Sequence, residues 1–139
     1  MHDFLHRAAI ALLLVSGVLT TVASVESIDA SRSVADAAGA LPQLLVQHWG
    51  FMMGLLGAGL VLAAVLPSLR LPVLGAAVLS KSAFAAIALT SGAAEAGGLS
   101  AALFELAMLT LLLSAGAVFV REAWQEARWH GMLPLRPEI

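Results

Sequence analysis

Two ionisable residues stand inside otherwise apolar segments, and their types and positions make them the best candidates for chemistry. Lys81 lies near the middle of an apolar segment over about 72–89. Glu105 lies about a turn and a half inside another segment over about 99–120. A charge at the centre of a membrane helix costs roughly 2.5–3.5 kcal/mol on insertion scales, so such residues usually face the bundle interior and pair. The sequence therefore predicts that Lys81 and Glu105 meet in a buried polar cluster.

Other polar residues can join this cluster from the same side of the protein. His48 stands at the start of an apolar segment over about 49–66. Further contributors are Ser80, Ser82 and Glu26. One interpretation is a static ion pair that fixes helix register; the other is an outward-opening pocket for a small polar ligand, a quinone head group or a proton. No serine–histidine–aspartate order or glycine-rich loop accompanies Lys81, so we predict no catalytic residue.

The composition shows what kind of elements position these residues. Of the 139 residues, 60% are hydrophobic and 12% are charged, the mean hydropathy is +0.95, and there is no cysteine. An average soluble domain is roughly 45–50% apolar and about 25% charged. These values argue against a soluble enzyme domain, a disordered chain and a disulfide scaffold. The net charge of −2 argues against nucleic acid as a partner. We therefore predict an integral membrane protein.

Four segments are long and apolar enough to cross a hydrocarbon layer of about 30 Å, which requires roughly 20 residues. They cover about 8–25, 49–66, 72–89 and 99–120. The predicted fold class is all-α, a single membrane domain built as a four-helix bundle. The first segment also resembles a signal peptide, with Arg7 before it and small residues at Ala23 and Ser24. Its apolar run is long for a signal peptide, so we expect a retained helix.

The basic residues predict the orientation, because positive residues favour the cytoplasmic face of a membrane. Four crossings place five arginines on one side: Arg7, Arg70, Arg121, Arg128 and Arg136. The opposite side then holds one arginine and four acidic residues: Arg32, Glu26, Asp29, Asp36 and Glu95. Both termini are therefore predicted to be cytoplasmic. The alanine-, leucine- and arginine-rich composition points to a bacterium with a GC-rich genome, and hence to the inner membrane.

The three tryptophans fit this arrangement. Trp49 stands at the outer end of the second segment, and Trp124 and Trp129 follow the fourth segment on the cytoplasmic side. Tryptophan favours the membrane–water interface, where its ring lies among the head groups. We predict that all three are interface anchors.

The connections between the segments differ in length. Pro67 and Pro72 predict a tight hairpin between the second and third segments. The small residues of these two segments should let the two helices pack closely. Residues 26–47 are the one long connection, expected as an outer loop, a surface cap or an interfacial helix, with Pro42 opening a short helix that runs into the second segment. Helix should continue over 121–130 in the cytoplasm, as a solvated end or as a docking surface for a partner.

The remaining histidines and glycines suggest two further sites. His2, His6 and His130 share the cytoplasmic side and have the side chains for a metal site, but we expect them to be solvated and predict no metal. Gly50 and Gly54 form a pair at the spacing that lets membrane helices approach closely. This pair either packs two helices of one chain or joins two copies in a homo-oligomer.

Residues 47–84 resemble a known group of membrane proteins. The sequences QHWGFMMGLLG over 47–57, PSLRLPVL over 67–74 and SKSAF over 80–84 look like those of small bacterial four-helix membrane proteins of the broad DoxX-like kind. The resemblance implies four helices and a polar cluster at His48 and Lys81. Members of that group are linked to thiol- or quinone-related redox systems, and the absence of cysteine here argues against a thiol role.

Three functions remain open at this point. The first is a non-enzymatic accessory or assembly subunit of a membrane complex, favoured by the small size and the projecting helix. The second is a small-ligand or proton-handling protein built on Lys81, Glu105 and His48, and the third is a redox-linked component that binds quinone. The expected partners are the lipid bilayer and a membrane protein or second copy. A sealed ion pair favours the first function, and a cavity open to the outside favours the others.

Overall fold

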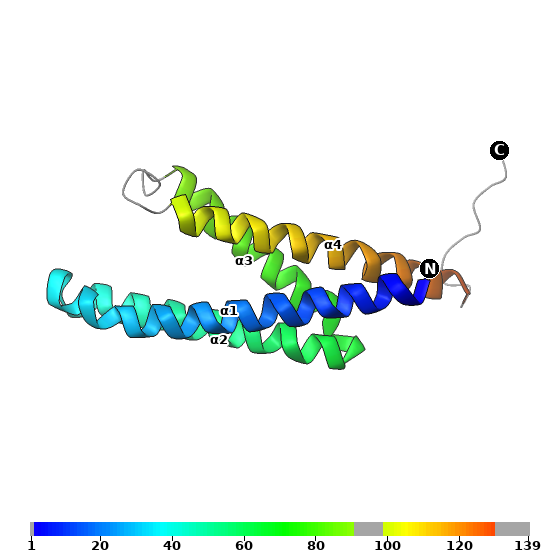
Figure 1. Cartoon of the computed structure of the whole chain (residues 1–139), viewed down its shortest axis with the longest axis horizontal. Helices are drawn as coiled ribbons and strands as arrows, with labels where there is room; N and C mark the ends of the chain where they lie inside the picture. Colours follow the sequence, from blue (N-terminus) through cyan, green and yellow to red (C-terminus); the bar gives the residue numbers. More distant parts are fainter. Residues whose placement is uncertain (1, 91–98, 130–139) are drawn as a thin grey trace.

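The computed structural model describes residues 2–90 and 99–129, and these form four long helices (Figure 1). The helices are α1 (His2–Ala38), α2 (Ala40–Val65), α3 (Arg70–Thr90) and α4 (Leu99–Trp129), with a short 3₁₀ turn η1 (Pro67–Leu69) between α2 and α3. All four are long and apolar enough to cross a membrane. The all-α class with four apolar helices is confirmed. The expected loop over 91–98 lies outside the described residues.

The expected outer loop over 26–47 is wrong. α1 runs on to Ala38 and α2 begins at Ala40, so one residue, Gly39, joins them. Its φ of 90° is open to glycine but strained for other residues. A loop was expected there because the stretch is charged. No proline or glycine interrupts it before Gly39, however. A charged helix is stable where water surrounds it. At 37 residues, α1 is about 55 Å long, well beyond the thickness of a hydrocarbon layer.

Pro42 lies in the first turn of α2, so the helix that it was expected to open does run into the second apolar segment. A helix does not use the backbone N–H groups of its first turn for internal hydrogen bonds, so proline is tolerated there. Residues 26–38 and 40–48 therefore extend the first two apolar segments as one continuous helical hairpin. In Figure 1 this hairpin turn is the cyan end of the molecule.

Glycines bring α1 and α2 together, where the sequence suggested close packing of α2 on α3. A Cβ atom added at Gly57 would lie 2.8 Å from the backbone oxygen of Gly17, and one added at Gly50 would lie 3.1 Å from that of Ser24. Gly54 faces the Ser24 side chain in the same interface. The small-residue spacing on α2 therefore packs helices within the chain, and its partner is α1.

The connection between α2 and α3 is tight, as Pro67 and Pro72 predict, but the two helices then diverge. η1 follows Leu66 directly, and the Leu69 backbone N–H donates to the carbonyl oxygen of Leu66 at 3.0 Å. From this turn α3 runs obliquely across the bundle, away from α2 and toward α4 (Figure 1). Close packing therefore pairs α1 with α2 and α3 with α4, and α2 contacts α3 much less. The expectation of tight packing between α2 and α3 was wrong.

The hydrophobic core occupies one half of the bundle. It lies toward the end where α1 begins, α4 ends, and α2 turns into α3 (Figure 1). Its buried members are Ala9, Leu13, Leu60, Ala63, Ala64, Leu74, Ala77, Leu112, Ala115 and Phe119. Toward the other end the α1–α2 pair and the α3–α4 pair separate. The protein is thus a wedge of two helical hairpins, joined at one end by a four-helix core.

α4 continues without a break through Trp129. This confirms the expected helical extension as far as residue 129, and residue 130 lies outside the described part. Trp124 and Trp129 are exposed on this extension, with 54% and 89% of their surface accessible. Neither ring is therefore buried inside the bundle.

The close approach of α1 and α2 predicts a position-specific effect of adding one methyl group. Gly57→Ala forces a Cβ against the backbone of Gly17, which cannot move aside as a side chain can. We expect a loss of about 1–3 kcal/mol of stability, as in overpacked cores, seen as a lower Tm by circular dichroism in detergent.

Gly116→Ala is the matched control for this substitution. Gly116 lies inside α4, and a Cβ there meets nothing within 4 Å. Because alanine is favoured over glycine inside a helix by roughly 0.5–1 kcal/mol, this variant should melt at the same temperature or higher. Equal losses in both variants would contradict the packing described for α1 and α2.

Candidate functional site

Lys81 and Glu105 form a buried ion pair between α3 and α4. The Lys81 Nζ donates a hydrogen bond to the Glu105 Oε2 at 2.7 Å. The lysine side chain is 1% exposed and the glutamate side chain 9%. Lys81 is the largest of the fully buried side chains. The structure therefore brings together the two ionisable residues that the sequence places inside apolar segments.

Regular helix faces carry both residues to this meeting point. On α3, Lys81 follows Ala77 and precedes Ala85, which share its buried face at one-turn spacing. On α4, Glu105 lies between the buried Ala102 and Met108. Because the residues flanking Lys81 on this face are alanines, the two helix backbones can approach closely enough for the lysine to reach the carboxylate.

The pair is sealed rather than open. Each charge would be costly in an apolar surrounding without the other, and together they neutralise one another through a charge-assisted hydrogen bond. Since almost none of the lysine is exposed, the pair as it stands presents no cationic group to a ligand. This geometry fits the interpretation of a static pair that holds α3 and α4 in register.

His48 lies apart from this pair. It is exposed on α2 and makes no hydrogen bond or ion pair with Lys81 or Glu105 in the described part of the chain. The expected cluster of three residues is therefore not formed. The cause is the divergence of α2 from α3, which carries His48 away from the buried face of α3. Glu26 is likewise exposed, on the surface of α1.

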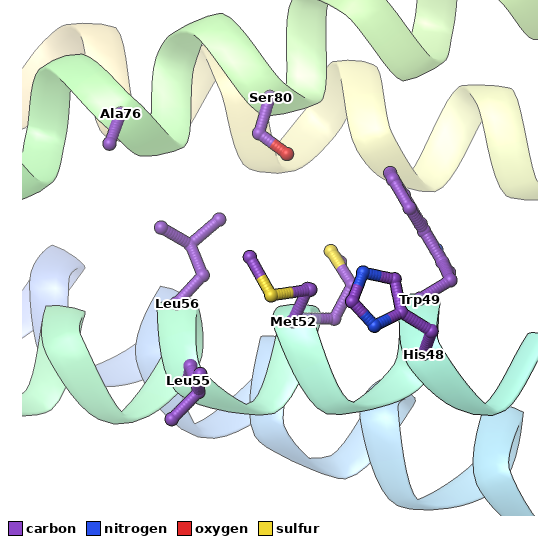
Figure 2. A pocket seen from close by; sticks show the side chains of 8 residues that line it. His48, Trp49, Met52, Leu55, Leu56, Ala76 and Ser80 are labelled. Carbon is purple, nitrogen blue, oxygen red and sulfur yellow. The ribbon is translucent and has the colours of Figure 1, made fainter. Parts of the chain in front are cut away.

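His48 instead lines an apolar groove between α2 and α3 (Figure 2). The groove encloses about 530 Å³. α2 contributes most of its lining, and α3 contributes two small residues. The lining residues are His48, Trp49, Met52, Met53, Leu55, Leu56, Ala76 and Ser80. In Figure 2 the Ser80 hydroxyl points from α3 toward Met52 on α2.

An aromatic contact bounds the groove at its His48 end. The rings of Trp49 and Phe84 stack across α2 and α3, with centroids 5.6 Å apart and planes 26° from parallel. A neighbouring space of about 300 Å³ is lined by Trp49, Ser80, Ala83, Phe84 and Ile87. Trp49 and Ser80 border both spaces. Trp49 is 40% exposed even though it stacks on Phe84. Its expected role as an interface anchor stays a prediction.

A second polar cluster joins the two hairpins at the core end, and sequence reasoning missed it. His6 Nδ1 on α1 lies 2.9 Å and 3.0 Å from the two carboxylate oxygens of Glu122 on α4. The ring of Phe119 meets His6 edge-on, with centroids 6.0 Å apart. Arg70 lies over the same Phe119 ring, 5.0 Å from its centroid. The sequence separation of His6 and Glu122 left no local signal for this contact.

Arg70 also completes the C-terminal end of α2. Its Nε donates to the carbonyl oxygen of Ala63 at 3.3 Å, and one terminal nitrogen donates to that of Ala64 at 3.5 Å. The last carbonyl groups of a helix have no partner within the helix and carry partial negative charge, so a cation is stabilising there. Arg70 therefore ties the end of α2 to Phe119 of α4.

Hydroxyl groups within the helices are mostly satisfied locally. Thr21, for example, donates to the carbonyl oxygen of Gly17 at 2.9 Å, one turn back. Ser16 Oγ and Thr20 Oγ1 are buried on α1 and lack a hydrogen-bond partner within the described residues.

As for metal, the described residues contain no group of three or more histidine, cysteine, aspartate or glutamate side chains that could hold an ion. His130 lies outside them.

The ion pair predicts a strong asymmetry between single and double substitutions. Lys81→Met or Glu105→Leu alone leaves one charge buried without its partner, which should cost about 3–5 kcal/mol. The double variant removes both charges and should recover most of that loss. Expression level and Tm in detergent measure the effect. A double variant no more stable than either single variant would refute a paired arrangement.

No protein-family model, no curated protein and no solved structure matches the chain. The DoxX-like resemblance and the quinone that it suggests therefore stay predictions. The features of the chain that bear on function are the sealed Lys81–Glu105 pair, the polar link between His6 and Glu122, and the apolar groove.

Proposed function

We propose that the protein is a multi-pass protein of a bacterial inner membrane and acts as a non-enzymatic accessory or assembly subunit of a membrane complex. The sealed Lys81–Glu105 pair carries this proposal. The two ionisable side chains within the apolar segments, Lys81 and Glu105, pair with each other. The Lys81 side chain is only 1% exposed, so a substrate cannot reach it. The pair supports a role in holding shape rather than in turnover.

The outward faces of the helices support a membrane setting. In the most apolar stretch of each helix only 28–33% is buried inside the protein. Large apolar side chains such as Leu55, Leu62, Leu79 and Leu113 are more than half exposed. Contiguous apolar surface of this extent is rare on soluble monomers. It is the surface that contact with lipid tails requires.

The distribution of arginines supports the proposed orientation. Arg7, Arg70, Arg121 and Arg128 all belong to the end of the bundle where His6 meets Glu122 and Arg70 meets Phe119. The opposite end carries the acidic helical hairpin around Gly39, whose one arginine, Arg32, lies 4.0 Å from Asp29. Since basic residues favour the cytoplasm, the arginine-rich end and both termini are proposed to face it.

The orientation can be tested with single cysteines, because the chain has none of its own. Asp36→Cys lies near the α1–α2 turn and Glu126→Cys lies on the α4 extension, and both positions are exposed. A membrane-impermeant maleimide added to spheroplasts should label Asp36→Cys at once. It should label Glu126→Cys only after the membrane is opened. The reverse pattern, or labelling of both from outside, would overturn the proposed topology.

The end of α4 supports the choice of an accessory role. Trp124 and Trp129 project from the helix beyond the four-helix core and are 54% and 89% exposed. Tryptophan is enriched both at membrane interfaces and among the residues that dominate protein–protein contacts. These two rings give the cytoplasmic end of the protein the means to bind a partner as well as a membrane surface.

The accessory role predicts a stable partner. The tagged protein, extracted in a mild detergent and purified in two steps, should elute with a second protein in fixed stoichiometry. Trp129→Ala should weaken this association at least several-fold and leave the Tm of the isolated chain unchanged, because the ring is almost fully exposed. Leu113→Ala, at an exposed position farther along α4 from the extension, is the control. A chain that elutes alone, or only with copies of itself, would refute the proposal.

A further inference from the structure

The groove between α2 and α3 is a built cavity that the proposed accessory function does not use. Its volume of about 530 Å³ falls within the range of about 300–1,000 Å³ typical of small-molecule sites. Met52 and Met53 line it from α2, and methionine side chains adapt their shape to an apolar ligand. The facing residues of α3 are small, Ala76 and Ser80, so the space between the helices stays open.

The polar side-chain groups of the groove are few. They come from the His48 ring and the Trp49 indole at one end and from the Ser80 hydroxyl nearer the middle (Figure 2). None of these three groups makes a hydrogen bond to another described residue. No lysine, arginine, aspartate or glutamate lines the groove. Lys81 follows Ser80 in sequence but faces α4 and is bound to Glu105.

The dimensions of the groove suit a single alkyl chain. On α2 the lining runs from His48 to Leu56, a rise of about 12 Å at 1.5 Å per residue. A single alkyl chain fits this length and volume, and its far end can continue into the surrounding lipid.

We infer that this groove binds a single-chain amphiphile with an uncharged, hydrogen-bonding head group, such as a long-chain alcohol or a monoacylglycerol. The head group lies between His48 and Ser80, and the chain runs along Met52, Leu56 and Ala76. The inference rests on the proposed membrane setting, in which the open side of the groove faces lipid tails. It needs no reaction and no contribution from the ion pair.

Photolabelling in native membranes tests the inference. The probe is a dodecanol analogue with a diazirine in its chain, and peptide mass spectrometry locates the labelled residues. Labels are expected on residues 48–56 and 76–84. Ala76→Trp, which fills the groove from an exposed position on α3, should reduce labelling about tenfold. Ala86→Trp is the matched control, on the same helix and outside both lined spaces, and should label normally.

The head group is tested with two further comparisons. Ser80→Ala and His48→Leu should each reduce labelling by the alcohol probe about three- to tenfold. A dodecanoate probe of equal chain length should label more weakly than the alcohol, because no lysine or arginine lines the groove. Stronger labelling by the charged probe, or loss of labelling equal in Ala76→Trp and Ala86→Trp, would overturn the inference.

A failure of this inference can be told apart from a failure of the membrane proposal. The Asp36→Cys and Glu126→Cys labelling is repeated in the same membranes. If both cysteines respond as expected and the groove is not labelled, the amphiphile site is refuted and the membrane protein stands. If the cysteines are equally accessible from outside, the membrane orientation on which the groove argument rests has failed first.

Discussion

The hydrogen bond between Lys81 and Glu105 is the constraint on which the arrangement of α3 and α4 depends. Two opposite charges in an apolar surrounding have one low-energy solution, which is to meet. Their 2.7 Å contact fixes the axial offset of the helices and also their rotation, because each charged residue must turn toward the other. Alanines at 77 and 85 on α3 then supply the space that this alignment needs, without bulky side chains that would hold the backbones apart.

The α1–α2 hairpin reaches a close pairing by different means. It uses the absence of side chains at Gly17, Gly50 and Gly57, so backbone meets backbone. The two hairpins are joined where large apolar side chains such as Leu60, Leu112 and Phe119 fill the space between them. Beyond that core the stack of Trp49 on Phe84 connects the hairpins, and the helix pairs separate toward the other end (Figure 1). The wedge shape follows from where the shared core ends along the four helices.

Sequence reasoning could predict what depends on composition and local pattern. The four apolar helices, the tight turn at Pro67 and the meeting of Lys81 with Glu105 all follow from hydropathy, proline chemistry and the cost of lone charges. It could not predict which helix α2 would pack against. Glycines indicate that a second helix packs closely, but they do not identify that helix. The prediction that His48 joins the Lys81–Glu105 pair was therefore wrong. The contact of His6 with Glu122 could not be predicted either, because it depends on long-range packing.

The rotation of α3 explains how one helix serves both a structural pair and an open groove. Successive residues in a helix differ by about 100°, so Lys81 with Ala77 faces α4 while Ser80 with Ala76 faces α2. The ion pair sets the register of α3 from the side that faces α4. The residues on the side that faces α2 are therefore not needed to hold α3 and α4 together. Small residues can remain there without loss of register. The buried charges thus leave the opposite face of α3 free to border a cavity, and the shape of that cavity can vary while the hairpin keeps its geometry.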